Sequence, residues 1–363
     1  MRTLIALLIA TTGLFADSRI TAAEAVVTAD PSQVTKRLDL IQLLLERYRY
    51  TADPALSAAA RKHLDVALRQ DGSSFLAKKH EAFLTLLEED FVAAKKLAEP
   101  LNRKSPDDVD LYGYLVDAES AIGNYDAAEK HANWMLRLRP ENRQGMRRAA
   151  ELRVVFGDVE GAILMLNEIY RLSPRTETVE RAWVFGRLAH LTMTKNPARA
   201  EQLARESLKL EPECFEGATA LAAVLAATKR HQEAAEVLKP LADRTQRASV
   251  FFALGRALTG VGDAAGAETA FARAAKLTKD SARLSDVHAQ MEYLLEVKRD
   301  PVTALHLAEA HSSYRNVWSL TWYSEALAAN GATEKSREIA KAALAAGSKE
   351  PRLMAIATKL GVN

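Results

Sequence analysis

The chain has 363 residues, and its 49 Lys and Arg against 47 Asp and Glu give a formal net charge of +2. A charge this close to neutral argues against a nucleic-acid partner, which a basic chain or a basic face would attract. The single cysteine, Cys214, excludes an internal disulfide, and we expect it to be a packing residue.

Residues 1–25 have the features of a secretory signal peptide. Arg2 gives a positive start, and Thr3–Ala16 is almost wholly apolar but too short to span a bilayer. Ala23-Glu24-Ala25 offers small residues at the two cleavage positions, so we predict cleavage after Ala25. The alternative is an uncleaved N-terminal anchor. One cysteine and no Asn-x-Ser/Thr sequon favour export to a bacterial periplasm or envelope.

A pattern with a period of 34 residues organises the stretch 109–176. Four pairs of like residues keep this spacing: Gly123 and Gly157, Ala128 and Ala162, Leu138 and Leu172, and Pro140 and Pro174. A fixed period of this length indicates repeated helix–turn–helix units.

The same signals for helix ends recur along the chain. A glycine that can end a helix precedes an Asp or Asn that can cap the next helix, as in Gly123-Asn124, Gly157-Asp158 and Gly262-Asp263. At Asp53-Pro54, Asn196-Pro197 and Asp300-Pro301, the cap is instead followed by a proline suited to the first helical position. A small residue that permits close helix packing comes four residues after each cap: Ser57, Ala94, Ala128, Ala162, Ala200, Ala267 and Ala304, with Ala234 and Ser336 in register after poorer caps.

One unit, 248–281, resembles the tetratricopeptide repeat family. It reads Phe251-x-x-Leu254-Gly255-x-x-Leu258 and then Ala267-x-x-x-Phe271, and departs from the family pattern at Lys279, where a proline is usual. The resemblance covers nearly all of the chain after the signal. It implies an all-α fold, a right-handed α-solenoid of about nine helix pairs over residues 26–350, with a C-terminal capping helix in 351–363.

The units follow one another without a linker. We expect helix pairs over 32–74, 75–108, 109–142, 143–176, a longer unit ending at Pro212, 215–247, 248–281, 282–316 and 317–350. Leu353, Ile356, Ala357 and Leu360 then repeat at helical spacing, which predicts a helix over Pro351–Leu360. In a solenoid of this kind, each unit is expected to contact only its neighbours.

No catalytic or metal-binding motif is found, so we expect no enzyme activity and no cofactor. His80-Glu81 begins like a zinc-protease motif, but Leu84 stands where the second histidine must be. His306 and His311 are five residues apart, so they diverge on a helix. The chain also lacks a Gly-rich phosphate loop and a Ser–His–Asp signature.

The family resemblance implies that the first helix of each unit lines a concave groove, with its second, fifth, ninth and twelfth positions facing a ligand. Transferred to this chain, the candidate partner-binding residues are Arg147, Glu151, Phe252, Arg256, Tyr293 and Trp318. Aromatic residues and arginine are common interface anchors. The alternative is that about half of these positions pack between units. The family's carboxylate clamp is absent, because Glu151 stands where it requires Asn.

The favoured function is therefore a non-enzymatic exported scaffold for protein–protein interaction or envelope complex assembly. Its partner would be a protein or peptide segment in the groove, with no nucleic acid and no membrane span after signal cleavage. The alternative is an accessory or glycan-reading subunit of an envelope hydrolase. An RNA-binding helical array is opposed by the near-neutral charge, the 34-residue period and the export signal.

Overall fold

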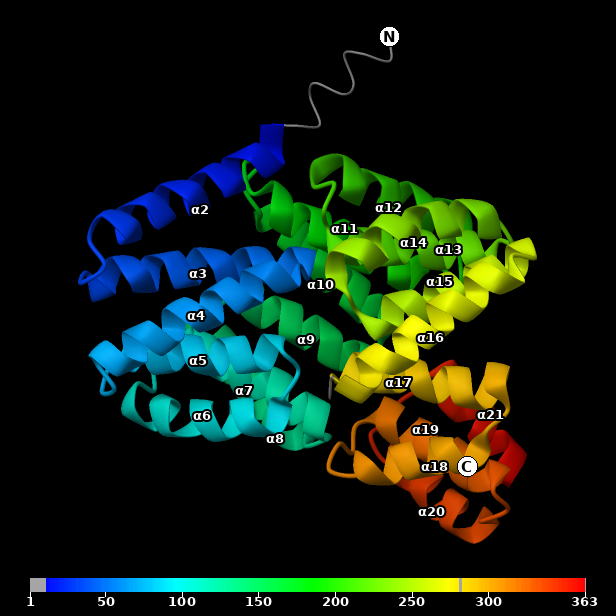
Figure 1. Ribbon diagram of the computed structural model, residues 1–363. Coiled ribbons are helices and arrows are strands. Elements are labelled where there is room, and N and C mark those ends of the chain that lie inside the picture. Colours follow the sequence, from blue (N-terminus) through cyan, green and yellow to red (C-terminus); the bar gives the residue numbers. More distant parts are fainter. Residues whose placement is uncertain (1–10, 281–282, 363) are drawn as a thin grey trace. The chain divides into compact units, whose positions relative to one another are not determined.

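The computed structural model describes residues 11–280 and 283–362. These residues form twenty α-helices and one π-helical turn and contain no strand, which confirms the all-α prediction (Figure 1). The elements are α2 Thr11–Ala29, α3 Val34–Thr51, α4 Pro54–Gln70, α5 Phe75–Leu87, α6 Phe91–Lys104, α7 Val109–Ile122, α8 Tyr125–Leu138, α9 Arg143–Val155, α10 Val159–Leu172, α11 Thr178–Thr192, α12 Pro197–Leu210, α13 Phe215–Ala227, α14 His231–Thr245, α15 Ala248–Val261, α16 Ala264–Asp280, α17 Leu284–Glu292, η1 Tyr293–Lys298, α18 Pro301–Ala310, α19 Val317–Ala329, α20 Thr333–Leu344 and α21 Pro351–Leu360.

The helices from α3 to α20 form the nine predicted pairs, and α21 follows the last of them. Helices begin at Phe75, Val109, Arg143, Phe215 and Val317, where the repeat pattern places the starts of units. Two features were not predicted. The helix of α17 continues as the π-helical turn η1, and α2 precedes the first pair.

The helix ends have the expected chemistry. Gly123, Gly157 and Gly262 have φ values of 94°, 80° and 90°, the left-handed conformation that ends a helix. The Asp53 and Asn196 side chains accept hydrogen bonds from the first turns of α4 and α12. The small residues that follow the caps are buried, as close helix packing requires: Ser57, Ala94, Ala128, Ala162, Ala200, Ala234, Ala267, Ala304 and Ser336.

The chain divides into two compact units, each built from two separate stretches. Unit 1 comprises residues 1–87 and 170–270, and unit 2 comprises residues 88–169 and 271–363. Within each unit the two stretches form hydrogen bonds between residues more than 160 positions apart. The expectation that each helix pair contacts only its sequence neighbours is therefore wrong.

In unit 1, a buried arginine joins the two stretches. Arg47, on α3, is only 6% exposed. Its guanidinium donates to Glu211 at 3.1 Å and to Glu213 at 2.5 Å, both in the turn before α13. Glu211 is fully buried, whereas Glu213 is about half exposed. This ion pair holds α3 against the start of α13.

In unit 2, helix ends join the two stretches. The amide N–H of Arg315 donates to the carbonyl of Ile122 at 2.8 Å, and the Asn316 side chain donates to the carbonyl of Ala121 at 2.7 Å. These carbonyls belong to the last turn of α7, which has no helical partner for them. The N–H of Val317 donates to the hydroxyl of Tyr125 at 2.8 Å. Arg315 and Asn316 thus cap α7 from the other stretch, and Val317 bonds the first residue of α8.

A second contact of this kind involves Glu89, which has a φ of 66° at the left-handed position after α5. Both its oxygens accept bonds of 2.9 Å from Ser285, one from the amide N–H and one from the hydroxyl. Ser285 lies in the first turn of α17, whose own N-cap residue, Arg283, makes no side-chain cap. Glu89 therefore caps α17 across 196 residues of sequence.

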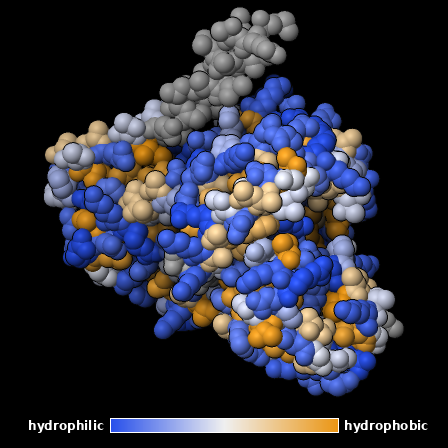
Figure 2. Space-filling view, turned by 45° about the vertical axis from the view of Figure 1, so that its right-hand side comes forward, coloured by the Kyte–Doolittle hydropathy of each residue, from blue (hydrophilic) through white to orange (hydrophobic). Residues whose placement is uncertain are grey.

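The face in Figure 2 is mostly hydrophilic, with separate apolar patches. Large apolar side chains exposed on the described surface include Leu164 and Trp318. At the N-terminus, the predicted cleavage point after Ala25 falls within α2. Residues 1–10 of the predicted signal lie outside the described residues.

Candidate partner-binding site

The six residues predicted to bind a partner lie in both units. Arg147 and Glu151 are on α9, Tyr293 begins η1, and Trp318 is in the first turn of α19, all in unit 2. Phe252 and Arg256 are on α15, in unit 1.

Unit 2 contains a hollow of about 290 Å³ at the junction of its two stretches. Two of the predicted residues, Glu151 and Trp318, line it together although 167 positions separate them in sequence. The full lining is Glu89, Phe91, Ser120, Ala121, Glu151, Leu152, Val155, Leu284, Ser285, His288, Asn316 and Trp318. We call this the α7–α19 hollow.

The helix-end contacts of unit 2 build the walls of this hollow. Ala121 and Asn316 are bonded to one another on one side, and Glu89 and Ser285 on another. Asn316 also caps α19, because its side-chain oxygen accepts from the Ser319 N–H at 2.9 Å. The cap fixes the first turn of α19, which carries Trp318, so the indole side chain is held by a rigid element.

Trp318 gives the hollow its exposed apolar surface. The residue is 38% exposed, while Leu152 and Val155 on α9 are buried beside it in the lining. Phe91 adds a ring that meets Tyr314 edge-on, with ring centroids 6.3 Å apart. An exposed tryptophan at a pocket with apolar walls is typical of a protein-interaction hot spot.

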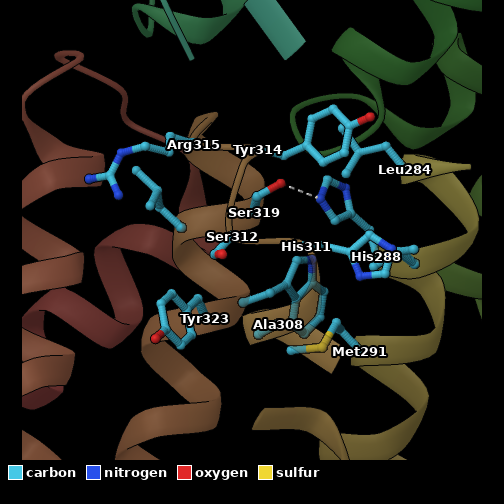
Figure 3. A pocket seen from close by; sticks show the side chains of 13 residues that line it. Leu284, His288, Met291, Ala308, His311, Ser312, Tyr314, Arg315, Ser319 and Tyr323 are labelled. Atoms are coloured by element: carbon cyan, nitrogen blue, oxygen red, sulfur yellow. Dashed lines mark hydrogen bonds between the residues drawn. The ribbon is translucent and has the colours of Figure 1, made fainter. Parts of the chain in front are cut away.

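His288 gives the lining of the α7–α19 hollow a polar side chain that carries no charge near pH 7. Its Nε2 is 2.8 Å from the Ser319 hydroxyl, the contact drawn as a dashed line in Figure 3. Burial lowers the pKa of His288 to about 4, so the ring is neutral near pH 7. Behind it, His288 also lines a cavity of about 30 Å³ with His311 and Met291, shown in Figure 3, which has room for about one water molecule.

Four of the predicted residues do not line the hollow. Phe252 is only 3% exposed, which agrees with the alternative that about half of these positions pack between helices. Tyr293 is half-buried and stacks on Phe271, with centroids 4.6 Å apart. Arg256 is exposed on α15, and Arg147 is half-buried on α9. Neither residue is among those that line the hollow.

Several lining residues carried no sequence signal for this role. Glu89 occupies a helix-ending position where the units that begin with α7, α9, α15 and α19 have glycine, and this departure is the one sequence feature that marks it. Ser285, His288 and Asn316 belong to the other stretch, and the repeat pattern gives no reason to pair them with Glu89. The positions transferred from the family therefore predicted Glu151 and Trp318, and no sequence signal predicted the other lining residues.

Other kinds of site have no support in the described part of the chain. No group of three or more His, Cys, Asp and Glu residues is placed to hold a metal ion within residues 11–280 and 283–362. No helix among the described residues combines the length and apolar character needed to cross a membrane. Cys214 is buried, and burial raises the pKa of its thiol to about 11, as expected for a packing residue.

Comparison with known proteins supports the interpretation of the repeats. Residues 114–175 and 189–249 match the family described as Tetratricopeptide repeat. A chain of the APC/C hetero-tetramer Cut9–Hcn1 has a similar fold, with a TM-score of 0.52 at 11% identity over 90% of this chain. These two segments are therefore tetratricopeptide repeats. The chain spans about half (55%) of the length of that Cut9–Hcn1 chain.

More distant tetratricopeptide repeat structures are also similar. A tetratricopeptide repeat protein from Parabacteroides merdae matches 80% of this chain and 99% of its own, with 14% identity and a TM-score of 0.39. Pseudomonas aeruginosa PilF matches 60% and 97%, with 18% identity and a TM-score of 0.43. No curated protein sequence matches this chain significantly.

Proposed function

We propose that this tetratricopeptide repeat protein is a non-enzymatic scaffold that binds a segment of a partner protein in the α7–α19 hollow. The observation that supports the proposal best is the position of Trp318, an exposed aromatic side chain over an apolar pocket. A tetratricopeptide repeat array is a general framework for protein interaction, so the fold alone does not identify a binding site. The evidence for binding comes from the residues of the hollow.

The shape of the hollow fits a side chain or short segment of a partner. Its volume of about 290 Å³ is close to the lower limit for small-molecule pockets, and its walls come from α7, α9, α17 and α19. His288 does lie beside a hydroxyl, that of Ser319, but burial lowers the pKa of the imidazole to about 4, which makes it a weak base near pH 7. Binding suits this chemistry better than catalysis.

Export to a bacterial envelope is part of the proposal. It rests on the apolar segment Thr3–Ala16 and on the small residues around Ala25. An envelope location would make the partner a component of an exported or surface assembly. The protein would then act after removal of residues 1–25.

Site-specific photo-crosslinking tests the binding site. We would place a photo-reactive phenylalanine analogue at Trp318, and in a matched control at Trp134, which is 41% exposed on α8. We expect a partner adduct from position 318 only. In pull-down, Trp318→Ala should weaken capture of that partner by about thirtyfold, the size of a hot-spot loss, while Trp134→Ala leaves it unchanged. Equal adducts from both positions, or undiminished capture by Trp318→Ala, would refute the site.

A further inference from the structure

A second hollow in unit 2 lies between η1, α19 and α21. It has a volume of about 350 Å³, and it shares no lining residue with the α7–α19 hollow. The lining is Leu295, Glu296, Arg299, Glu325, Ala329, Arg352, Ala355, Ile356 and Lys359. We call it the η1–α21 pocket. All of these residues belong to residues 271–363, the second stretch of unit 2, so the pocket forms within one compact unit.

Both carboxylates of the η1–α21 pocket are bonded to one arginine. Arg352 donates to Glu296 at 2.6 Å and to Glu325 at 2.5 Å. Its guanidinium also lies over the Trp322 ring, 3.6 Å from the ring centroid, so three contacts fix its position. The two carboxylates are therefore held at Arg352, and together they carry one negative charge more than Arg352 neutralises.

Two further cations line the same pocket. Arg299 and Lys359 are exposed, and within the described residues neither side chain makes a hydrogen bond or an ion pair. The lining thus carries three positive charges against two negative ones. Lys359 follows Arg352 by seven residues, which places it about 10 Å further along α21. An anion is the charged group that these two unpaired cations favour.

The backbone at Arg299 is unusual in two ways. The residue follows the π-helical turn η1, and such turns are frequent at functional sites. Its φ of 58° is left-handed, a conformation in which a side chain is strained and glycine is not. Gly331 has the corresponding position after α19, with a φ of 80°. An arginine at this position keeps a guanidinium in the pocket at the cost of strain, and strained residues cluster at ligand-binding sites.

We infer that the η1–α21 pocket binds an acidic side chain of a partner protein, whose carboxylate pairs with Arg299 and Lys359. The apolar members of the lining, Leu295, Ala329 and Ala355, would contact the carbon stem of that side chain or an apolar neighbour. Complementary charge contributes specificity in such contacts. The inference goes beyond the proposed function, because the pocket and the α7–α19 hollow are separate sites.

Peptide binding to the full chain tests this inference. The probes are pools of short peptides, acetylated at the N-terminus and amidated at the C-terminus so that only side chains carry carboxylates. The pools share apolar residues and carry Glu, Gln or Lys at the charged positions, and binding is read by fluorescence anisotropy. We expect Glu pools to bind about fivefold more tightly than Gln pools, the size of a contact between exposed charges. High salt should reduce this preference, because it screens such charges.

Arg299→Gly is the most informative variant. Glycine takes the left-handed conformation without strain, so the melting temperature should not fall, yet the preference for Glu pools should decrease. Lys359→Gln should decrease it as well, and the double variant should abolish it. Lys341→Gln makes the same charge change on exposed α20 outside the pocket and should leave the preference unchanged.

The outcomes separate this inference from the proposed function. Trp318→Ala should weaken all pools by the same factor and keep the preference, because Trp318 belongs to the other hollow. If Trp318→Ala leaves all binding unchanged, the proposed function alone fails. The inference is wrong if Glu and Gln pools bind the native chain equally, if no pool binds, or if the preference survives in the double variant. It is also wrong if Arg299 and Lys359 affect only peptides with a free C-terminal carboxylate, because the pocket would then bind a chain end.

Discussion

The two units join their separate stretches by different chemistry. Unit 1 depends on one buried cation, Arg47, between Glu211 and Glu213. Unit 2 divides the same task among backbone groups at helix ends, bonded to Asn316 and Glu89. A buried ion pair is severely destabilising when one partner is removed, because the other charge stays desolvated. In a set of helix caps, the removal of one cap costs a smaller part of the free energy of unfolding. The comparison predicts one sensitive residue in unit 1 and graded sensitivity in unit 2.

The largest expected effect is the loss of the arginine in unit 1. Arg47→Ala leaves the fully buried Glu211 without its cation, and breaking a buried pair costs about 3–5 kcal/mol. Asn316→Ala in unit 2 removes a cap and one hydrogen bond, for which we expect about 1–2 kcal/mol. Denaturant unfolding gives the total change, and hydrogen exchange at α3 and α13 assigns it to unit 1.

A double variant controls for the loss of packing. Arg47→Met with Glu211→Leu removes both charges and keeps most of the buried volume, so much of the lost stability should return. If the double variant is as unstable as Arg47→Ala, packing and not charge joins the stretches. Equal losses from Arg47→Ala and Asn316→Ala would contradict the contrast between the units.

Acid should weaken both units through one buried histidine in each. Burial lowers the pKa of His80 in unit 1 and of His288 in unit 2 to about 4, against about 6.5 in the unfolded chain. The unfolded state therefore binds the proton first. The stability that each neutral histidine contributes is fully present above pH 6.5. As the pH falls towards 4, the folding equilibrium constant decreases by up to about tenfold per pH unit for each histidine.

Hydrogen exchange at pH 7 and pH 5 would resolve the two contributions. His80→Gln should remove part of the pH dependence from α5, and His288→Gln should do so in α17. The His80 ring bonds Gln42 on α3 at 3.0 Å, so effects of its variant should stay within unit 1. Equal protection of the native chain at both pH values would show that neither histidine is held neutral.

The smallest expected effect concerns two residues in the left-handed backbone conformation. Each of them follows the first helix of its helix pair. Lys229 in unit 1 has a φ of 62°, and within the described residues its exposed side chain makes no hydrogen bond or ion pair. Glu89 in unit 2 has a φ of 66° but caps α17 through Ser285. Lys229→Gly should therefore raise stability by up to about 1 kcal/mol, since glycine adopts this conformation without strain. Glu89→Gly should lower it, because the lost cap outweighs the relief. Thermal melts of the two variants that shift in the same direction would contradict this difference.

The helices could be predicted from the sequence because their signals are local. Glycine at 123, 157 and 262 ends helices, and caps such as Asp53 begin them, within a few residues of the effect. The pairing of Glu89 with Ser285 has no local signal, because any exposed carboxylate could have met that helix end. The repeat pattern also predicts which helix face is inward but not what covers the other face. Phe252 was therefore assigned to a groove although it is buried.

Because each unit is built from two separate stretches of sequence, the order of synthesis affects when each unit can fold. Tyr125 precedes its partner Val317 by 192 residues, which a ribosome would take about 10–40 s to add. During that interval unit 1 can fold as soon as residue 270 has emerged. Residues 88–169 still lack residues 271–363, the second stretch of unit 2. A premature stop codon shortly after residue 270 would thus spare every residue of unit 1 and release a chain with half of unit 2, its apolar surfaces open to aggregation.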